Sequence, residues 1–119
     1  MQASNATSGK LRLTVLQAKL TRDTETFGKM DPYCVITYRQ EKHKTQTKNN
    51  AGKTPVWNQT FDLDIKYIGD DIEITVLDED ITESDTIGFC NFKPSTLSVP
   101  GGITEWFDLQ YRGKKAGQI

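Results

Sequence analysis

Apolar and polar residues alternate with a period of two along most of this 119-residue chain. The pattern runs through Leu11, Leu13 and Val15, and it recurs over residues 57–65 and 72–76. Successive side chains of a strand point to opposite faces, so this alternation predicts strands with one buried face. Shorter runs of the same kind cover residues 33–39, 43–47, 87–92 and 106–111. The pattern favours a two-sheet sandwich of seven or eight short antiparallel strands.

Turn-forming residues separate these runs at 49–52, 69–71 and 100–102. No long helical period is present, and one short helical turn is expected over residues 94–98. Residues 1–9 are small and polar, which predicts a flexible N-terminal leader. Residues 10–119 then have the length of a single domain with one core.

Composition excludes several classes of function. The formal net charge is -1, so no global field draws the chain to nucleic acid. The single histidine and the absence of a glycine-rich phosphate loop or nucleophile signature predict that the chain is not an enzyme. Cys34 and Cys90 are expected to be buried free thiols of a cytoplasmic protein.

The acidic residues are concentrated in two short segments between predicted strands. Such a concentration of like charge opposes folding unless a cation offsets it. Calcium suits that role, because it takes 6–8 oxygen ligands in flexible geometry. A solvated acidic loop without a metal is the alternative. The two segments hold Asp23, Glu25 and Asp31, and Asp78, Glu79, Asp80, Glu83 and Asp85.

The second acidic segment has a spacing that suits a bound ion. Side chains at i and i+2 of an extended strand point the same way, so Asp78 and Asp80 are predicted to face one ion together. Asp85 follows five residues later and would close the loop from its far side.

Four motifs resemble those of the C2 domain family. Residues 30–34 (MDPYC) resemble its (S)DPYV signature, and residues 54–61 (TPVWNQTF) resemble its NPxWNExF stretch. Residues 76–88 resemble its VxDxDxxxxDxxIG calcium loop, and residues 106–109 resemble its WYxL strand. The four motifs occur in the order of the family and extend the resemblance over about residues 10–119.

The resemblance implies an all-β, eight-stranded antiparallel Greek-key sandwich with calcium-binding loops at one end. It also implies a topology whose final strand lies at the C-terminus, begins at residues 114–119 and is cut short after them. Glu25 replaces the usual Asp and lengthens the ligand arm, and Asp23 is an alternative ligand. The calcium ligands carried over by position are Glu25, Asp31, Asp78, Asp80 and Asp85.

A basic cluster lies between the two acidic segments. Lys42, Lys44 and Lys48 share one face of a predicted strand and are expected to contact lipid head groups. The resemblance places Lys42 and Lys44 near positions that bind phosphoinositides in protein kinase C relatives. Val35 and Thr37 replace the other basic positions of that site. A solvated strand face is the alternative.

Large apolar residues occur within both acidic segments, Phe27 in the first and Ile81 in the second. Phe27 either folds back to cap the core or enters a membrane together with Ile81. The function that follows from the resemblance is calcium-dependent binding to anionic phospholipid membranes. The protein would then be cytoplasmic and become a peripheral membrane protein when calcium rises. The alternative is a calcium-independent lipid- or protein-interaction module of the same fold.

Overall fold

The computed structural model describes residues 1–5 and 9–119. Those residues form eleven strand segments and one short helix. Their bounds are β1 (Gln2–Asn5), β2 (Lys10–Gln17), β3 (Lys19–Leu20), β4 (Pro32–Tyr38), β5 (Glu41–Lys44), β6 (Val56–Asp64), β7 (Ile72–Asp78), β8 (Asp85–Phe92), α1 (Pro94–Leu97), β9 (Ile103–Thr104), β10 (Asp108–Tyr111) and β11 (Lys114–Gln118).

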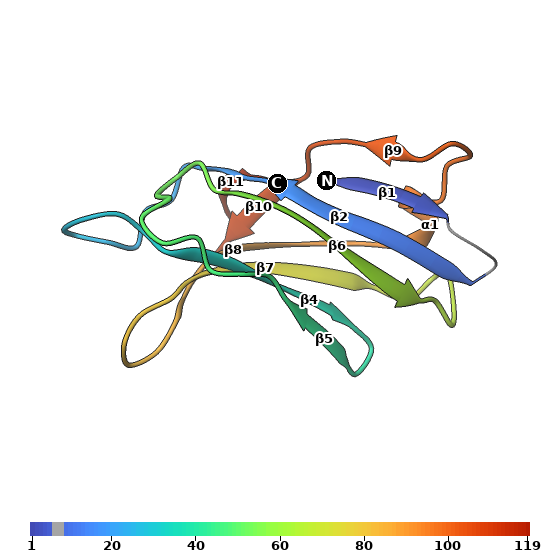
Figure 1. Ribbon diagram of the computed structural model, residues 1–119, viewed down its shortest axis with the longest axis horizontal. Coiled ribbons are helices and arrows are strands. Elements are labelled where there is room, and N and C mark those ends of the chain that lie inside the picture. Colours follow the sequence, from blue (N-terminus) through green and yellow to red (C-terminus); the bar gives the residue numbers. More distant parts are fainter. Residues whose placement is uncertain (6–8) are drawn as a thin grey trace.

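The strands form an antiparallel sandwich of two sheets (Figure 1). One sheet has the order β6-β2-β1-β9, and the other has the order β3-β11-β10-β8-β7-β4-β5. The chain passes between the sheets at Ala18, whose amide donates to the carbonyl of Pro55 at 3.0 Å. The predicted all-β sandwich is therefore confirmed, as is the short helical turn, which is α1.

The core follows the alternation seen in the sequence. Leu11, Leu13 and Val15 of β2 are buried, while their neighbours point outward. Strand β7 repeats the pattern with Ile72 and Ile74. These side chains meet in one apolar cluster between the sheets, which also takes in both cysteines as free thiols.

The strand expected over residues 43–47 lies earlier in the chain than predicted. Strand β5 covers Glu41–Lys44 and pairs with β4. Thr45 leaves the surface, because its hydroxyl accepts a hydrogen bond from the Cys34 amide at 2.8 Å. Lys48 therefore lies outside β5, and the prediction that it shares a strand face with Lys42 and Lys44 is wrong.

The N-terminal residues differ from the expected flexible leader. Gln2–Asn5 form β1, which pairs with β2 on one side and β9 on the other. Met1 and Ala3 are buried at alternate positions, a pattern too short to be recognised as a strand in the sequence. Residues 6–8 of the predicted leader lie outside the described part of the chain.

The C-terminal residues close the second sheet. Strand β11 pairs with β10 and with β3, and the buried Ile119 exchanges two backbone hydrogen bonds with Phe107. The continuation of this strand beyond Ile119 stays a prediction. In the part of the chain that the structure describes, no helix is long and apolar enough to cross a bilayer.

Candidate functional site

The two acidic segments lie at the same end of the sandwich (Figure 1). The first acidic loop, residues 21–31, precedes β4, and the second acidic loop, residues 79–84, joins β7 to β8. Strand β7 pairs with both neighbours, so Asp78 lies opposite Pro32 on one side and Asp85 on the other. The sheet register thus brings together residues that are about fifty positions apart in the chain.

Asp78 is the anchor of this end. Its side chain is 0% exposed, although a carboxylate is rarely fully buried without partners. The Asp31 amide donates to its Oδ1 at 2.7 Å, and the Thr24 hydroxyl donates to its Oδ2 at 2.7 Å. Asp78 therefore fixes the base of the first acidic loop from within the second sheet.

Glu25 lies against this buried carboxylate. Hydrogen bonding to Asp78 and the charge of Asp78 raise the pKa of Glu25 to about 7, with smaller contributions from desolvation and from the charges of Asp80 and Asp31. A carboxyl group that retains its proton to this pH indicates a shortage of local positive charge. The backbone amide of Glu25 donates a hydrogen bond to Oδ1 of Asp23 at 2.9 Å.

The two loops enclose an open trough of about 550 Å³. Among the predicted ligands, Glu25, Asp31 and Asp80 line it, and Asp78 contacts the first two from behind. Asp85 is not one of the lining residues. The complete lining is Glu25, Phe27, Gly28, Lys29, Asp31, Asn50, Glu79, Asp80 and Ile81.

Asp23, the alternative ligand, faces elsewhere. It lines a separate groove on the other flank of the first acidic loop, together with Lys29 and Lys53. The structure thus groups Glu25, and not Asp23, with the carboxylates of the second acidic loop.

The trough is lined by carboxylate oxygens, which are the ligand atoms that calcium prefers. Over residues 1–5 and 9–119, however, no three acidic, histidine or cysteine side chains are already arranged to hold a metal. The carboxylates of Glu25, Asp31, Asp78 and Asp80 nevertheless fit calcium by their chemistry and are the residues that would hold it.

Phe27 and Ile81 are at the rim of the trough and are 89% and 100% exposed. Phe27 therefore does not cap the core, and that interpretation of the sequence is wrong. Both side chains project from the loops that line the trough and are free to contact another surface.

Two basic residues of β5 lie on the edge strand of the second sheet. Lys42 pairs with Thr37 and Lys44 pairs with Val35 across the edge of the second sheet. Lys44 also reaches the second acidic loop, with Nζ 3.8 Å from a carboxylate oxygen of Glu79 and 4.3 Å from the centre of the Tyr33 ring. The basic face and the acidic end are therefore in contact.

Two residues of the site were missed in the sequence. The Thr24 hydroxyl donates a hydrogen bond to the Asp78 carboxylate. The backbone amide of Asn50 donates to Oδ1 of Asp31 at 2.7 Å. Asn50 has a positive φ of 57°, which the turn-forming residues 49–52 could have indicated. No sequence signal marks Thr24.

Comparison with known proteins identifies the class of this protein. Residues 9–109 match the C2 domain family. The "16 kDa phloem protein 2" of Arabidopsis thaliana is 29% identical over 80% of this chain and 65% of that protein. The "Calcium-dependent lipid-binding protein" of the same plant is 35% identical over 85% of this chain and 20% of that protein.

The fold agrees with these matches. A C2 domain of plant Extended Synaptotagmin 1 superimposes with a TM-score of 0.79 at 20% identity, covering 96% of this chain and 91% of that one. The chain belongs to the C2 domain family, a family of lipid-binding modules. It spans 65% of the phloem protein and about a fifth of the calcium-dependent relative.

Proposed function

We propose that this C2 domain binds anionic phospholipid membranes in a calcium-dependent manner. The observation that carries the proposal is one trough with acidic walls and an apolar rim. Glu25, Asp31 and Asp80 supply the walls, and Phe27 and Ile81 stand exposed at the rim. A cation in the trough would bring lipid phosphate and the apolar rim to the same surface.

The switch is electrostatic. Without a cation, the carboxylates of the trough repel an anionic bilayer. Calcium bound by Glu25, Asp31, Asp78 and Asp80 supplies positive charge where these carboxylates converge. Asp85 begins β8 opposite Asp78, so it can complete the ligand set from the second acidic loop.

The exposed rim and the basic face add to this attraction. Phe27 and Ile81 would enter the interface, and burying one such side chain contributes roughly 1.5–3 kcal/mol. Lys42 and Lys44 lie on the flank formed by the edge strand β5, where each cation near an anionic surface contributes about 1 kcal/mol. Phosphoinositides are candidate ligands of this flank. The protein would then reside in the cytoplasm and associate with membranes when calcium rises.

Calcium-independent binding of lipid or of a protein partner is the second candidate. It is favoured by the lack of a ready-made metal arrangement in the described residues and by glutamate at position 25. The two candidates differ in one measurable respect, which is whether calcium stabilises the folded domain.

The test is thermal melting with and without calcium, followed by sedimentation with phosphatidylserine vesicles. Calcium at 100 times its Kd should stabilise the domain by about 2.7 kcal/mol, which is a rise of several degrees in Tm. Asp78→Asn with Asp80→Asn should abolish both the rise and the calcium-dependent sedimentation. A wild-type Tm that does not change in millimolar calcium would favour the second candidate.

The chain contains a matched control for this variant. Asp62 and Asp64 have the same spacing at the end of β6, but each is paired with a cation of the protein. Arg12 is 3.0 Å from Asp62, and Lys66 is 2.9 Å from Asp64. Asp62→Asn with Asp64→Asn removes the same charge and should leave the calcium response unchanged.

A further inference from the structure

The cationic side chains of this protein are held in two different ways. Arg39 and Lys66 lie within 2.9 Å of an aspartate oxygen, which offsets their charge. Arg22 and Arg112 instead lie against the ring of Tyr111, with their guanidinium carbons 3.8 and 5.3 Å from the ring centre. An aromatic ring attracts a cation without neutralising it, so these two neighbouring guanidinium groups keep their charge.

Arg22 is fixed by both of the strands that flank it. Its backbone amide donates to the Ala116 carbonyl of β11 at 3.2 Å, and its Nη2 donates to the Thr86 carbonyl of β8 at 3.4 Å. Over residues 1–5 and 9–119 the side chain forms no ion pair, and its buried Nε has no hydrogen-bond partner. The fold therefore positions this guanidinium group while leaving part of its hydrogen-bonding capacity unused.

Arg112 belongs to the two-residue turn between β10 and β11. Arg112 and Gly113 have φ values of 51° and 77°, which is the geometry of a type I′ hairpin turn. Such turns favour asparagine and glycine, so an arginine in this conformation is uncommon. Lys114 follows the turn, pairs with Tyr111 across the hairpin and adds a third cation to this position.

A second tyrosine–arginine pair provides an internal comparison. Arg39 directly follows Tyr38, the last residue of β4, as Arg112 follows Tyr111 at the end of β10. Arg39 also has a positive φ, of 53°. Its Nε donates to the Asp70 carboxylate at 2.7 Å, however. Two turns of similar backbone conformation thus differ in whether the protein offsets the charge of the arginine.

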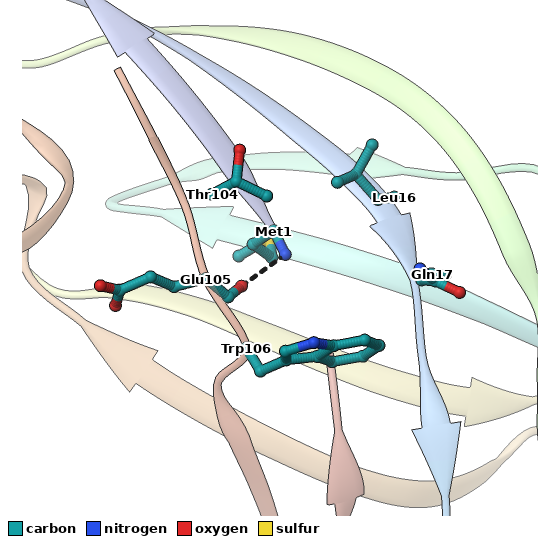
Figure 2. A pocket seen from close by; sticks show the side chains of 6 residues that line it. All are labelled: Met1, Leu16, Gln17, Thr104, Glu105 and Trp106. Atoms are coloured by element: carbon teal, nitrogen blue, oxygen red, sulfur yellow. Dashed lines mark hydrogen bonds between the residues drawn. The ribbon is translucent and has the colours of Figure 1, made fainter. Parts of the chain in front are cut away.

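The ring of Trp106 does not gather cations in the same way. Lys19 lies over it, with its Nζ 5.0 Å from the ring centre. Figure 2 shows this ring beside Gln17 and Glu105. In the described part of the chain, one lysine or arginine side chain lies over Trp106, whereas two guanidinium groups meet at Tyr111.

We propose that Arg22, Tyr111 and Arg112 form a binding site for a dianionic phosphomonoester, with Lys114 at its edge. A guanidinium group binds phosphate oxygens through parallel N–H donors, and stacking on an aromatic ring keeps that planar fork oriented. Two such groups match the double negative charge of a phosphomonoester, which a single carboxylate does not carry.

The site is separate from the acidic trough, because none of its residues lines the trough. It does not depend on the proposed calcium function, so every measurement below is made in EDTA. The same phosphomonoester chemistry occurs in soluble phosphates and in the head group of a lipid such as phosphatidic acid. The experiment therefore has one arm for each source.

The first arm is a titration of the full chain with sodium phosphate at neutral pH and constant ionic strength. NMR signals of the arginine Nε–H groups should shift saturably for Arg22 and Arg112. Arg22→Gln and Arg112→Gln should each raise the Kd at least about tenfold, because each removes a charge-assisted contact. Arg112 is exposed, so Arg112→Gln keeps the test decisive even where loss of the Thr86 contact lowers the stability of Arg22→Gln.

Arg39→Gln is the matched control variant. It removes the same charge from the comparable turn and should leave the Kd for phosphate unchanged. An equal loss of affinity in Arg39→Gln and Arg112→Gln would overturn the proposal, since binding would then follow net charge and not this site.

The second arm is sedimentation with vesicles that contain phosphatidic acid. Sedimentation that sodium phosphate displaces, and that is lost in the variant Arg22→Gln with Arg112→Gln but not in Arg39→Gln, assigns the lipid head group as ligand. Saturable binding of free phosphate without such sedimentation assigns a soluble phosphomonoester. If neither arm shows binding that depends on Arg22 and Arg112, the proposal is refuted. The calcium response is measured without phosphate, so either proposal can fail while the other stands.

Discussion

Carboxylates at the two ends of the sandwich lie in opposite electrostatic environments. At the end that carries the 65–71 loop, Asp70 receives hydrogen bonds from Arg39 and from Tyr38, both at 2.7 Å. These bonds lower the pKa of Asp70. At the acidic end, Glu25 faces other carboxylates, and its pKa is raised to about 7. Asp70 is neutralised by the protein itself, whereas Glu25 faces carboxylates and would need a proton or a bound cation to offset their charge.

Two tyrosines of β4 show the same contrast. The Tyr38 hydroxyl is buried and joins Asp70 to the amide of Lys66, which donates to it at 2.8 Å. The Tyr33 hydroxyl donates to the Ser84 Oγ at 2.8 Å in the second acidic loop. Tyr38 thus connects a network that is complete within the protein, while Tyr33 makes one contact to a loop proposed to respond to calcium.

The largest expected effect concerns the apolar rim. Phe27→Ala should weaken calcium-dependent binding to phosphatidylserine vesicles by roughly ten- to a hundredfold, because about 1.5–3 kcal/mol of burial is lost. Its Tm should change little, since Phe27 is 89% exposed. The matched control is Ile68→Ala, which removes an exposed apolar residue from the opposite end. Equal losses in the two variants would show that the effect is not specific to the rim.

The next effect is on folding stability and belongs to the opposite end. Tyr38→Phe should lower the free energy of unfolding by about 1–3 kcal/mol, because it leaves buried polar partners unsatisfied. Tyr33→Phe removes a single hydrogen bond and should cost about 0.5–1.5 kcal/mol. Denaturant titration in the absence of calcium measures both variants. A larger loss in Tyr33→Phe would contradict the assignment of the complete network to the Tyr38 end.

A smaller effect is expected on the basic face. Lys42→Gln should weaken vesicle binding by about fivefold, which corresponds to about 1 kcal/mol per cation. Its calcium affinity without lipid should not change. Lys44→Gln should instead raise calcium affinity, since the Lys44 ammonium lies 3.8 Å from Glu79. Calorimetric titration of both variants checks this difference, and identical calcium affinities would show that Lys44 is not coupled to the trough.

The smallest effect is a dependence on pH of opposite sign at the two ends. The raised pKa of Glu25 means that the folded state without calcium holds this proton more tightly than the unfolded state. Stability from this group is present below its ordinary pKa and is lost as pH rises to about 7. Asp70, with its lowered pKa, stabilises above its ordinary value and loses this effect as pH falls.

Thermal melting between about pH 4 and 8 tests the sign for Glu25, because this range spans its ordinary pKa of 4.5 and its raised pKa of about 7. Melting at pH values below 3.8 tests the opposite sign for Asp70. Glu25→Gln stays neutral and should remove the decline of stability toward about pH 7. Calcium affinity of the wild type should increase over the same interval, because the ion competes with the proton. A calcium affinity that is constant over this interval would show that Glu25 is not a ligand.

The strands were predictable because their signal is local. In β2 and β7 each residue's hydrophobicity is enough to assign its face, and the structure confirms those faces. β5 could not be placed correctly, because its end depends on Thr45 bonding to Cys34, a residue eleven positions away. β1 was missed for a similar reason, since its stability comes from pairing with β2 and β9 rather than from its own composition.

The candidate site was likewise predictable from the sequence only in part. Asp62 and Asp64 have the same spacing as Asp78 and Asp80, and the sequence distinguishes them only by the higher density of acidic residues around the second pair and by the resemblance to a family. In the structure, Asp62 and Asp64 form ion pairs with Arg12 and Lys66. Asp78 and Asp80 instead lie near Glu25 and Asp31. Which acids converge without cations is therefore a property of the strand register.

By itself, the sequence determined the alternating strands, the turns between them and the two acidic segments, because each rests on residues close together in the chain. Only the tertiary structure decided that Glu25 faces Asp78, that Phe27 is exposed and that Lys44 reaches Glu79. It also decided that Met1 pairs with Glu105 and Ile119 pairs with Phe107 along one extended segment. The physical reason is that the pairing of distant strands sets these distances, and such pairing depends on the whole core at once.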